Sequence, residues 1–447
     1  MSTTYLISGA SLPDGTRTDL LLADGVIADV GTSLSSAGAE RVDADGLIAL
    51  PGLVDLHTHL REPGYEQSET VLTGTRAAAA GGFTAVFAMA NTSPVADTAG
   101  VVEQELSLGE QAGYATVQPI GAVTVGLAGE QLAELGAMAS SRARVRVFSD
   151  DGFCVWDPVL MRRALEYVKS FDGVIAQHAQ EPRLTAGAQM NEGAVSGELG
   201  LTGWPAVAEE SIIARDVLLA EHVGSRVHIC HVSTAGSVDV LRWAKGRGIA
   251  VTAEVTPHHL LLDEELVRSF DARYKVNPPL RRREDVLALR EALADGTIDI
   301  VATDHAPHPV ENKDCEWDAA ANGMVGLESA LSVVHAAVVA DGRLDWSDVA
   351  RVLSSAPARI GRISGHGQSL VVGAPAQVTL YDPNASRTFG TADLAGKGVN
   401  SPYLGRELPG RVVSTFHAGF ATVLDGKLRP ADEVAAHSRS RRTENHA

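Results

Sequence analysis

The chain has 447 residues, of which 45% are hydrophobic, and its 37 basic and 56 acidic side chains give a formal net charge of -19. That charge disfavours nonspecific nucleic-acid binding, because a phosphate backbone would meet a repulsive field. No apolar run reaches the roughly 18 residues of a membrane span, and the amino terminus lacks a basic stretch followed by a hydrophobic core, so we expect a cytoplasmic protein. Three widely spaced cysteines, Cys154, Cys230 and Cys315, favour a reducing compartment and exclude a disulfide framework or a cysteine-rich zinc site.

The amino-terminal segment, residues 1 to about 50, is predicted to form short strands joined by tight turns. Asp24-Gly25 and Asp45-Gly46 supply the positive backbone angles that hairpins need. A similar pattern returns near the carboxyl end, where Ala376–Tyr381 and Phe420–Leu424 are β-prone and Asp425-Gly426 follows the second segment. We therefore expect residues 1–50 and 365–430 to form one small β-sandwich domain built from both termini. The polar, charge-rich residues 431–447 are expected to be a disordered tail.

Between these segments, strands and helices alternate. Helical patterns include Asp157 to Lys169 and Arg283 to Leu293. Eight strands are predicted, near residues 50–57, 83–89, 115–121, 143–149, 173–178, 226–231, 249–254 and 298–304. Eight strands separated by helices predict an α/β fold in which residues 51–364 form a closed parallel TIM (β/α)8 barrel, whose catalytic residues lie at the carboxyl ends of the strands.

Candidate metal ligands lie at the ends of several predicted strands. His57-Thr58-His59 closes the first strand, and two histidines one residue apart on a strand point to the same side, so both can bind one ion. With 15 histidines in the chain, chance predicts roughly 0.5 such pairs, so the motif is weak by itself. Its context strengthens it, because His178, His231 and Asp304 also end apolar, β-prone runs. These positions predict a metal-dependent enzyme whose ligands are histidine and carboxylate.

Several ordered motifs give the chain a resemblance to the dihydroorotases of the amidohydrolase superfamily, and the resemblance spans nearly the whole chain. The motifs are Pro51-Gly52-Leu53-Val54-Asp55-Leu56-His57-Thr58-His59-Leu60-Arg61, Ala80-Gly81-Gly82-Phe83-Thr84 leading to Asn91-Thr92, Phe148-Ser149-Asp150-Asp151-Gly152, Asn277-Pro278-Pro279-Leu280-Arg281 and Ala302-Thr303-Asp304-His305-Ala306-Pro307-His308. Their order and strand context make the combined signal far more specific than any single motif.

The resemblance implies a set of six metal ligands: His57, His59 and Asp304 for the more buried ion, His178 and His231 for the second, and Asp151 as the bridge between them. Many relatives use a carboxylated lysine as the bridge, at the end of the fourth strand. The first lysine of this chain is Lys169, beyond that strand, so the resemblance is to the type I branch in which aspartate replaces the lysine. Imidazole and carboxylate suit one or two Zn(II) ions per subunit, and Co(II) or Mn(II) suit the same ligands.

The activity implied is the reversible, zinc-dependent cyclisation of N-carbamoyl-L-aspartate to L-dihydroorotate in de novo pyrimidine biosynthesis. Zinc would polarise the amide carbonyl and supply a hydroxide nucleophile, since it lowers the pKa of bound water to about 7. Asp304 would act as the general acid and base. The resemblance assigns the substrate carboxylate to Arg61, Asn91 and His308, and the ring amides to Asn277 and to main-chain groups of the segment 322–326, including Met324 and Gly326.

Neighbouring polar residues receive structural interpretations. His258 and His259 exceed the ligand count and are expected to have structural roles or to orient a ligand, and Asp150 is expected to be a hydrogen-bonding neighbour. Three acidic residues are expected to be surface charge, namely Glu66, Glu69 and Asp97. Relatives commonly have proline where this chain has Ala90, which loosens the backbone before Asn91. The segment 308–323 has little periodicity and is predicted to be a mobile lid over the substrate.

Two other functions stay open. A hydantoinase or allantoinase would share the fold and the metal chemistry, but these enzymes generally use the carboxylated lysine and need no carboxylate clamp. A catalytically silent homologue could serve as a scaffold for aspartate transcarbamoylase, although silent copies usually lose metal ligands. Association with aspartate transcarbamoylase rests on the resemblance alone. A homodimer is a further open alternative, since barrels commonly associate.

Overall fold

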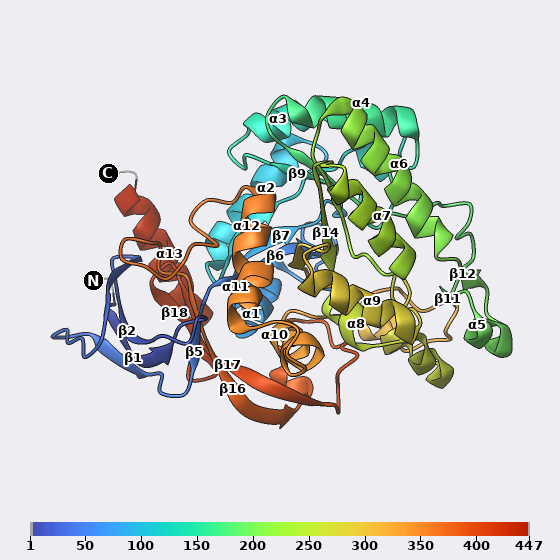
Figure 1. Ribbon diagram of the computed structural model, residues 1–447. Helices are drawn as coiled ribbons and strands as arrows, with labels where there is room; N and C mark the ends of the chain where they lie inside the picture. The colour runs from blue at the N-terminus through green and yellow to red at the C-terminus, as the bar shows by residue number, and fades with distance from the viewer. Residues whose placement is uncertain (1–2, 446–447) are drawn as a thin grey trace.

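A computed structural model describes residues 3–445, and within them eight short parallel strands form a barrel covered by helices (Figure 1). The barrel strands are β6 (Leu53–Thr58), β7 (Phe83–Ala88), β8 (Thr116–Pro119), β9 (Val147–Phe148), β10 (Val174–Gln177), β13 (Val227–Ile229), β14 (Val251–Val255) and β15 (Ile300–Val301). Isolated bridges complete the circle: Gly121 pairs with Phe148 between β8 and β9, and Thr58 pairs with His305 between β6 and β15. The predicted barrel and its eight strands are confirmed.

Helices follow most of the strands and shield the barrel from solvent. The longer ones are α1 (Val71–Ala80), α2 (Ala99–Ala112), α4 (Pro158–Lys169), α6 (Val207–Val223), α7 (Ala235–Gly246) and α9 (Arg283–Ala294). Shorter ones are α3 (Leu135–Ser140), α5 (Ala194–Leu199), α8 (Pro257–Leu261), α10 (Ala330–Val334), α11 (Trp346–Ala350) and α12 (Ala356–Gly361), and a small pair of strands, β11 (Met190–Asn191) and β12 (Gly203–Trp204), precedes α6. Among residues 3–445, no helix combines the length and apolar character needed to cross a membrane.

Helix α4 illustrates how the local sequence specifies these elements. The Asp157 carboxylate accepts a hydrogen bond from the Leu160 amide at 2.8 Å, and Pro158 occupies the first helical position, where its missing N–H costs nothing. Its buried side chains recur at helical spacing and lie on one face, at Met161, Ala164, Leu165 and Val168. The helical pattern predicted from Asp157 to Lys169 is therefore confirmed, with Asp157 as its cap.

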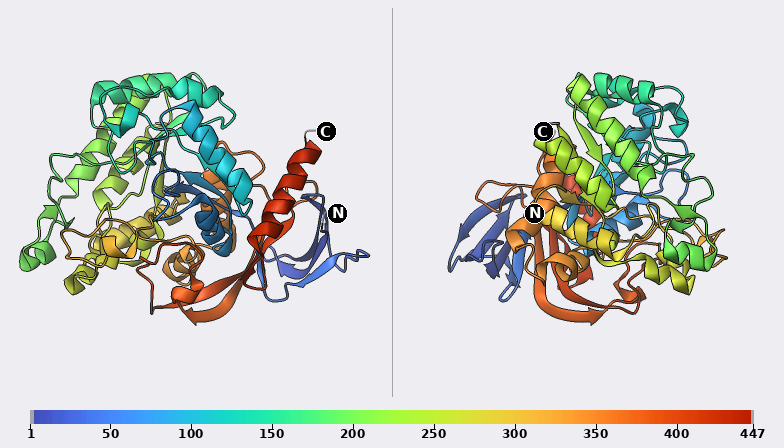
Figure 2. Two further views of the ribbon diagram at one scale, coloured as in Figure 1. Left: turned by 180° about the vertical axis from the view of Figure 1, so that it is seen from behind. Right: turned by 45° about the vertical axis from the view of Figure 1, so that its right-hand side comes forward.

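Both ends of the chain meet in a second, smaller β domain, beside the barrel (Figures 1 and 2). Its nine strands are β1 (Tyr5–Ser11), β2 (Arg17–Ala23), β3 (Val26–Gly31), β4 (Glu40–Asp43), β5 (Ile48–Pro51), β16 (Val378–Thr388), β17 (Glu407–His417), β18 (Phe420–Leu424) and β19 (Lys427–Leu428). Strand β5 pairs with β16, which joins the amino-terminal strands to the carboxyl-terminal ones. The expected terminal β-sandwich domain is thus confirmed.

The chain leaves this domain for the barrel at Gly52, between β5 and β6. A Cβ atom at Gly52 would lie 2.4 Å from the Thr84 hydroxyl oxygen, so the close approach of the two strands requires glycine. The first metal-binding motif therefore begins directly at the domain junction.

The predicted turns have mixed outcomes. Asp24 and Gly25 have φ of 51° and 79° and connect β2 to β3, and Asp425 and Gly426, with φ of 50° and 73°, connect β18 to β19, so both are hairpin turns. The hairpin predicted at Asp45-Gly46 is wrong. Strands β4 and β5, on either side of it, each pair in parallel with β1 rather than with each other. A turn dipeptide identifies a change of direction but not the partner of the strand that follows.

The carboxyl-terminal segment also departs from expectation. Residues 431–445 of the expected disordered tail form a helix, α13 (Ala431–Asn445), and residues 446–447 of that prediction lie outside the described residues. The Val434 side chain of α13 is 1% exposed. Val434 packs with Ala79, Tyr114 and Val423, between the barrel and the β domain. The prediction failed because one apolar residue in a charged segment gives no periodic pattern, and the docking surface comes from distant parts of the chain.

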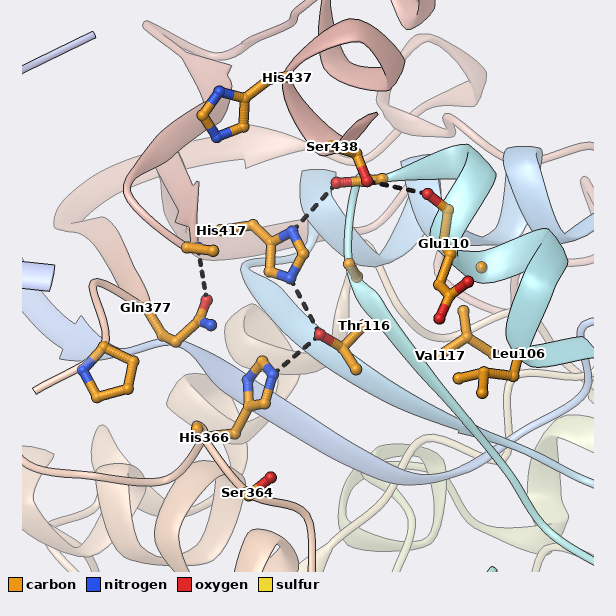
Figure 3. A pocket seen from close by; sticks show the side chains of 16 residues that line it. Leu106, Glu110, Thr116, Val117, Ser364, His366, Gln377, His417, His437 and Ser438 are labelled. Carbon is orange, nitrogen blue, oxygen red and sulfur yellow. Dashed lines mark hydrogen bonds between the residues drawn. The ribbon is translucent and has the colours of Figure 1, made fainter. Parts of the chain in front are cut away.

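Near α13, polar side chains line a hollow of about 370 Å³ between the two domains (Figure 3). The Thr116 hydroxyl oxygen lies 3.0 Å from Nε2 of His366 and 3.0 Å from Nε2 of His417. This one hydroxyl of barrel strand β8 therefore contacts both the segment between α12 and β16 and strand β17 of the β domain. The Ser438 hydroxyl of α13 donates to the Glu110 carbonyl at 2.9 Å. These contacts hold α13 and the β domain against the barrel.

Docking of α13 can be tested through Val434. Replacing it by alanine should destabilise the protein by about 2 kcal/mol, because a buried apolar contact is lost and a cavity remains. Thermal unfolding should show a lower melting temperature than for Val159→Ala, a control helical valine that is 65% exposed. Equal melting temperatures for the two variants would show that α13 does not pack as described.

Candidate metal centre

The six predicted metal ligands converge at the carboxyl ends of five barrel strands. His57 is in β6 and His59 follows it, Asp151 comes after β9, His178 directly follows β10, His231 comes two residues after β13, and Asp304 follows β15. All six are at least 94% buried: His57, His59, Asp151, His178, His231 and Asp304. In a closed parallel barrel these strand ends share one rim, so residues far apart in sequence meet there.

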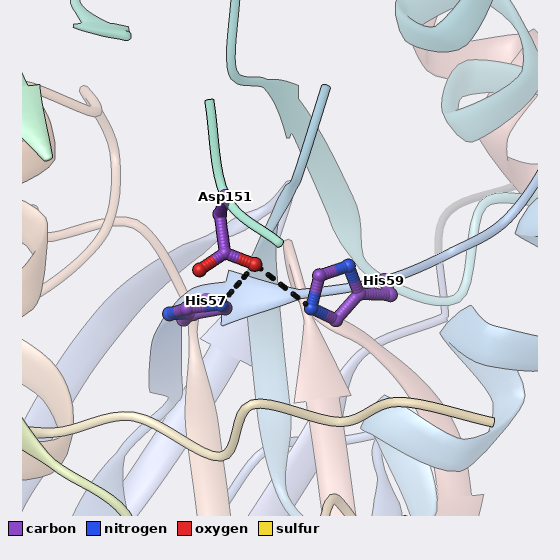
Figure 4. Close-up of side chains that lie close together, drawn as sticks. All are labelled: His57, His59 and Asp151. Atoms are coloured by element: carbon purple, nitrogen blue, oxygen red, sulfur yellow. Dashed lines mark ion pairs between the residues drawn. The ribbon is translucent and has the colours of Figure 1, made fainter. Parts of the chain in front are cut away.

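The first group of ligand atoms surrounds one point (Figure 4). Nε2 of His57 and Nε2 of His59 each lie 3.4 Å from Oδ2 of Asp151. On the other side, Oδ1 of Asp304 lies 3.4 Å from Nε2 of His57 and 3.0 Å from Nε2 of His59. Two ligands that bind one zinc ion at about 2.1 Å with tetrahedral angles are separated by about 3.4 Å. The spacing of these four atoms therefore fits a divalent ion.

The second group uses the other oxygen of Asp151. Oδ1 of Asp151 lies 3.1 Å from Nδ1 of His178 and 3.1 Å from Nε2 of His231, and the two nitrogens are 2.9 Å apart. Each carboxylate oxygen thus faces a different pair of imidazoles. The arrangement suits a binuclear metal site in which Asp151 bridges two ions.

The hydrogen bonds around the imidazoles leave the correct nitrogen available to a metal. Nδ1 of His57 donates to Glu254 Oε1 at 2.6 Å, and Nδ1 of His59 donates to Asn91 Oδ1 at 3.0 Å. Each of these rings therefore turns its Nε2 inward, toward Asp151 and Asp304. In the part of the chain that the structure describes, the buried Nε2 of His57 has no hydrogen-bond partner, as expected of a nitrogen whose lone pair is reserved for a metal.

The ring of His178 is oriented in a similar way, but here Nε2 has the outer hydrogen bond and Nδ1 faces the other proposed ligands. Its Nε2 donates to Gln180 Oε1 at 2.7 Å, which leaves Nδ1 for the second group. The same oxygen of Gln180 accepts a hydrogen bond from Asn277 Nδ2 at 3.1 Å. Gln180 consequently connects a proposed metal ligand to a proposed substrate contact.

The electrostatics of the cluster call for cations. Burial by itself would lower the pKa of His57, but the carboxylates of Asp151, Glu254 and Asp304 raise it well above its ordinary value. Burial would likewise raise the pKa of Asp304, but His57 and His59 lower it to about 2. Asp151, surrounded by imidazoles, also has its pKa held well below the usual range. Buried ionised carboxylates need compensating positive charge, which divalent metal ions provide.

Glu254 is the residue that sequence reasoning missed. It ends β14, is 1% exposed, and contacts His57 Nδ1 through Oε1 and His228 Nε2 through Oε2, at 2.6 and 3.0 Å. His57, Cys230 and Glu254 could also surround a metal, but the short His57 contact is a hydrogen bond, and burial raises the pKa of the Cys230 thiol so far that no thiolate is available. The signal was present, since a carboxylate at a predicted strand end matched the pattern of the other ligands.

The interpretation of Glu69 as surface charge is wrong. Its side chain is fully buried at the start of α1, and its carboxylate accepts hydrogen bonds from the main-chain N–H of Lys397 at 3.2 Å. Nε2 of His305 lies 3.7 Å away. Thr70 and Thr73 also donate to this carboxylate, but Lys397 and His305 lie more than 200 residues away in the chain, so a local pattern could not reveal that Glu69 is buried. Glu66 is exposed as expected, and Asp97 is half-buried.

Two structural interpretations are confirmed. Asp150 accepts hydrogen bonds from the amides of Val123 and Thr124 at 2.8 and 2.9 Å. Nδ1 of His259 lies 2.8 Å from the Thr256 hydroxyl, and Nε2 donates to the Pro278 carbonyl at 3.1 Å, so this ring holds two loops together. The neighbouring His258 is also buried, which lowers its pKa to about 4.

Arg61 and His308, two of the residues predicted to bind a carboxylate, lie in the loops that follow β6 and β15. Arg61 follows His59 by two residues, and its Nε donates to the Pro307 carbonyl at 3.3 Å. Nε2 of His308 donates to the Asn322 carbonyl at 2.8 Å, and burial together with the charge of Arg61 lowers its pKa to about 3. His308 is therefore neutral before a substrate binds, and Arg61 supplies the positive charge.

The residues predicted to bind ring amides differ in availability. Within residues 3–445, the buried Oδ1 of Asn277 has no hydrogen-bond partner and can accept from a ligand N–H. The Gly326 amide, by contrast, already donates to His305 Nδ1 at 3.3 Å, and the Met324 carbonyl accepts from the Ala306 amide at 2.8 Å. Asn277 is thus the amide contact that the geometry supports best.

Comparison with known proteins finds relatives that match nearly the whole chain. The profile of a family described as "Dihydro-orotase-like" matches residues 46–237. A dihydroorotase from Leifsonia xyli subsp. xyli is 81% identical, covering 95% of this chain and 97% of the relative. Dihydroorotases from Streptomyces coelicolor and Mycobacterium tuberculosis are 69% and 55% identical, covering 95% and 93% of this chain and 99% and 97% of the relatives.

Among solved structures, an L-hydantoinase from Arthrobacter aurescens superimposes with a TM-score of 0.84 at 24% identity, covering 96% of this chain and 98% of that one. A dihydropyrimidinase from Brevibacillus agri has a TM-score of 0.81 at 22% identity, covering 95% and 96% of the two chains. At this level of identity the likeness establishes a shared fold.

Metal content will test the bridging geometry. The purified chain, stripped with a chelator and reloaded with zinc, should hold about two ions. Asp151→Ala should weaken the binding of both ions, because it removes one ligand from each group, whereas His178→Ala should weaken the binding of only one ion. Elemental analysis after dialysis measures both, with His222→Ala, an exposed histidine of α6, as the control that keeps two ions. If Asp151→Ala lost only one ion, Asp151 would not be a bridge.

Proposed function

Because this chain belongs to the dihydroorotase family, we propose that it catalyses the reversible cyclisation of N-carbamoyl-L-aspartate to L-dihydroorotate, a step of de novo pyrimidine biosynthesis. The observation that carries the proposal is the geometry of Asp151, whose two oxygens face two separate pairs of imidazoles beside Asp304. A cyclic amide is a poor electrophile and water a poor nucleophile at neutral pH, so this reaction needs a centre of that kind.

We propose zinc for both positions and Asp151 in place of the carboxylated lysine of other relatives. The donor set of imidazole nitrogen and carboxylate oxygen suits Zn(II), and Lys169 is the first lysine of the chain, well beyond β9. When bound, the ions supply Lewis-acid polarisation of the amide carbonyl and lower the pKa of the attacking water.

Asp304 is proposed as the general base and acid. Oδ1 contacts His57 and His59, and the imidazoles keep the pKa of this carboxyl at about 2, so it is ionised and ready to accept a proton. In hydrolysis it would take a proton from the attacking water and deliver it to the leaving ring nitrogen, and in cyclisation the same transfers run in reverse. Its position at the end of β15 gives it rigid support for both roles.

Arg61 is proposed as the main contact for the substrate carboxylate. Its guanidinium carries a fixed charge and can form two parallel hydrogen bonds with a carboxylate. His308 lies close enough to Arg61 for the guanidinium charge to lower the pKa of the ring, and a bound carboxylate would raise that pKa. Asn91, whose Oδ1 accepts from His59, has its amide nitrogen for the same carboxylate.

Asn277 is proposed to accept a hydrogen bond from a substrate amide N–H through its unsatisfied Oδ1. Met324 and Gly326, which lie beside His305, are proposed to shape the wall that faces the ring, and the Gly326 amide would need to leave His305 Nδ1 to bind a ligand. Recognition of the ring would therefore rest on Asn277 more than on this segment.

A direct assay tests the proposed reaction. Purified, zinc-loaded protein should hydrolyse L-dihydroorotate at alkaline pH, and a chelator should abolish the activity until zinc is restored. Asp304→Asn should lower kcat by a factor on the order of 100 to 10,000, because the proton carrier is lost. Hydantoin and allantoin serve as comparison substrates. Turnover of either one without turnover of dihydroorotate would favour a hydantoinase-type enzyme, and no turnover by the metal-loaded protein would favour a silent scaffold.

Arg61 provides the test of carboxylate recognition. Arg61→Ala should lower kcat/KM for dihydroorotate roughly a hundredfold, since the carboxylate would be left buried without a cationic partner. Steady-state kinetics should place most of the loss in KM. Arg142→Gln removes an arginine that is ion-paired with Glu110 at the surface, and this control should keep wild-type kinetics. A similar loss in both variants would argue against a specific role for Arg61.

A further inference from the structure

The segment predicted to be a mobile lid is fastened by a buried lysine. Lys313 lies in the middle of residues 308–323, and its side chain is 9% exposed. The ammonium group donates to the carbonyls of Ala321 at 2.7 Å, Gly323 at 3.0 Å and Lys275 at 3.1 Å. Three carbonyl oxygens match the three N–H groups of an ammonium ion, so the charged group is fully hydrogen-bonded.

Burying a lysine ammonium group costs free energy, which its hydrogen bonds offset in part. A buried ammonium loses its hydration, and burial together with the nearby Lys275 lowers the pKa of Lys313 to about 7. All three of its hydrogen bonds go to main-chain atoms rather than to a carboxylate. The side chain therefore determines the path of the backbone on both sides of one residue, Asn322.

Asn322 in turn holds His308. Its carbonyl oxygen accepts the hydrogen bond from His308 Nε2 at 2.8 Å. A second route ties the main chain of His308 to the same segment, because its amide donates to Asn400 Oδ1 at 3.2 Å, and Nδ2 of Asn400 donates to the Gly323 carbonyl at 3.1 Å. Space at this point is tight, since a Cβ atom at Gly323 would lie 2.9 Å from His308 Nε2. A shift of the 321–323 backbone would turn or displace the imidazole.

We propose that Lys313 is a positioning residue: by holding the carbonyls of Ala321 and Gly323 it fixes the Asn322 carbonyl, and through it the His308 imidazole that contacts the substrate carboxylate. This inference rests on the proposed function, because it assigns His308 to carboxylate recognition. Lys313 touches no substrate itself and acts only through the segment 321–323.

The neighbouring Lys275 offers a matched control. Its ammonium is also buried and also binds main-chain carbonyls of the same segment, those of Trp317 and Asp318, with the latter at 3.1 Å. These residues lie away from Asn322 in sequence. If Lys313 only stabilises the loop, Lys313→Met and Lys275→Met should have similar consequences. If it positions His308, the two variants should differ.

The test is a double-mutant cycle on the zinc-loaded enzyme, with metal content and circular dichroism confirming that each variant is folded. Lys313→Met should raise the KM for dihydroorotate roughly tenfold and change kcat less than about threefold, whereas Lys275→Met should change KM less than about threefold. In a His308→Ala background the effect of Lys313→Met should disappear, because the group that it positions is absent. Additive effects of Lys313→Met and His308→Ala would overturn the proposal.

Hydrogen exchange supplies a readout that needs no activity. Amides of residues 321–323 should exchange faster in Lys313→Met than in the wild type, and Lys275→Met should leave them protected. Unchanged exchange in Lys313→Met, or equal increases in both variants, would contradict the proposal that Lys313 holds the 321–323 backbone. A wild-type protein that hydrolyses no dihydroorotate would refute the proposed function instead, and the exchange experiment would still decide whether Lys313 holds the 321–323 backbone.

Discussion

The burial of ionised carboxylates among imidazoles is the constraint on which the rest of the site depends. Asp151 places one oxygen against His57 and His59 and the other against His178 and His231, all removed from water. A buried carboxylate is stable only where cations or hydrogen bonds compensate for lost hydration. Outer partners orient the rings: Glu254 contacts Nδ1 of His57 and Asn91 contacts Nδ1 of His59, so that Nε2 of each ring faces inward. The cluster therefore forms a binding site whose charge and geometry are complete only with metal.

Residues beside these ligands in the chain close the barrel. The bridge between Thr58 and His305 joins the first and last strands, and the adjacent Asp55 accepts hydrogen bonds from the amides of His57 and Thr303 at 3.1 and 3.0 Å. Asp55 thus fixes the backbone directly before both His57 and Asp304. Its burial raises the pKa of its carboxyl to about 6. Closure of the fold and placement of the proposed acid-base group consequently depend on one set of contacts.

Local patterns in the sequence were enough to predict the barrel and to locate most of the proposed metal ligands. Each barrel strand is a short β-prone run, so the ends of the strands, and with them His57, His178, His231 and Asp304, could be located from the amino-acid sequence alone. The motifs of a known family added Asp151. The features that could not be predicted depend on residues that are distant in the chain. The turn at Asp45-Gly46 does not indicate which strand pairs with the strand that follows it. Glu69 resembles any acidic residue near the start of a helix, and α13 has too little apolar surface to indicate where it packs. Glu254 was accessible in principle, because it ends a predicted strand.

The small β domain and its connections contribute directly to the rim of the site. Asn400, in the segment between β16 and β17, is 3% exposed and donates to the carbonyls of Ala306 and Gly323 while accepting from the amide of His308. Lys397, in the same segment, donates its amide to Glu69 at the start of α1. From outside the barrel, Asn400 thus reaches the loop after Asp304, and Lys397 reaches the loop between β6 and α1. Contacts from a second domain add to those within the barrel and lower the freedom of these loops before substrate binds, so less entropy is lost on binding. The domain built from both termini therefore acts on the site as an external support, which accounts for its attachment beside the residues that carry the chemistry.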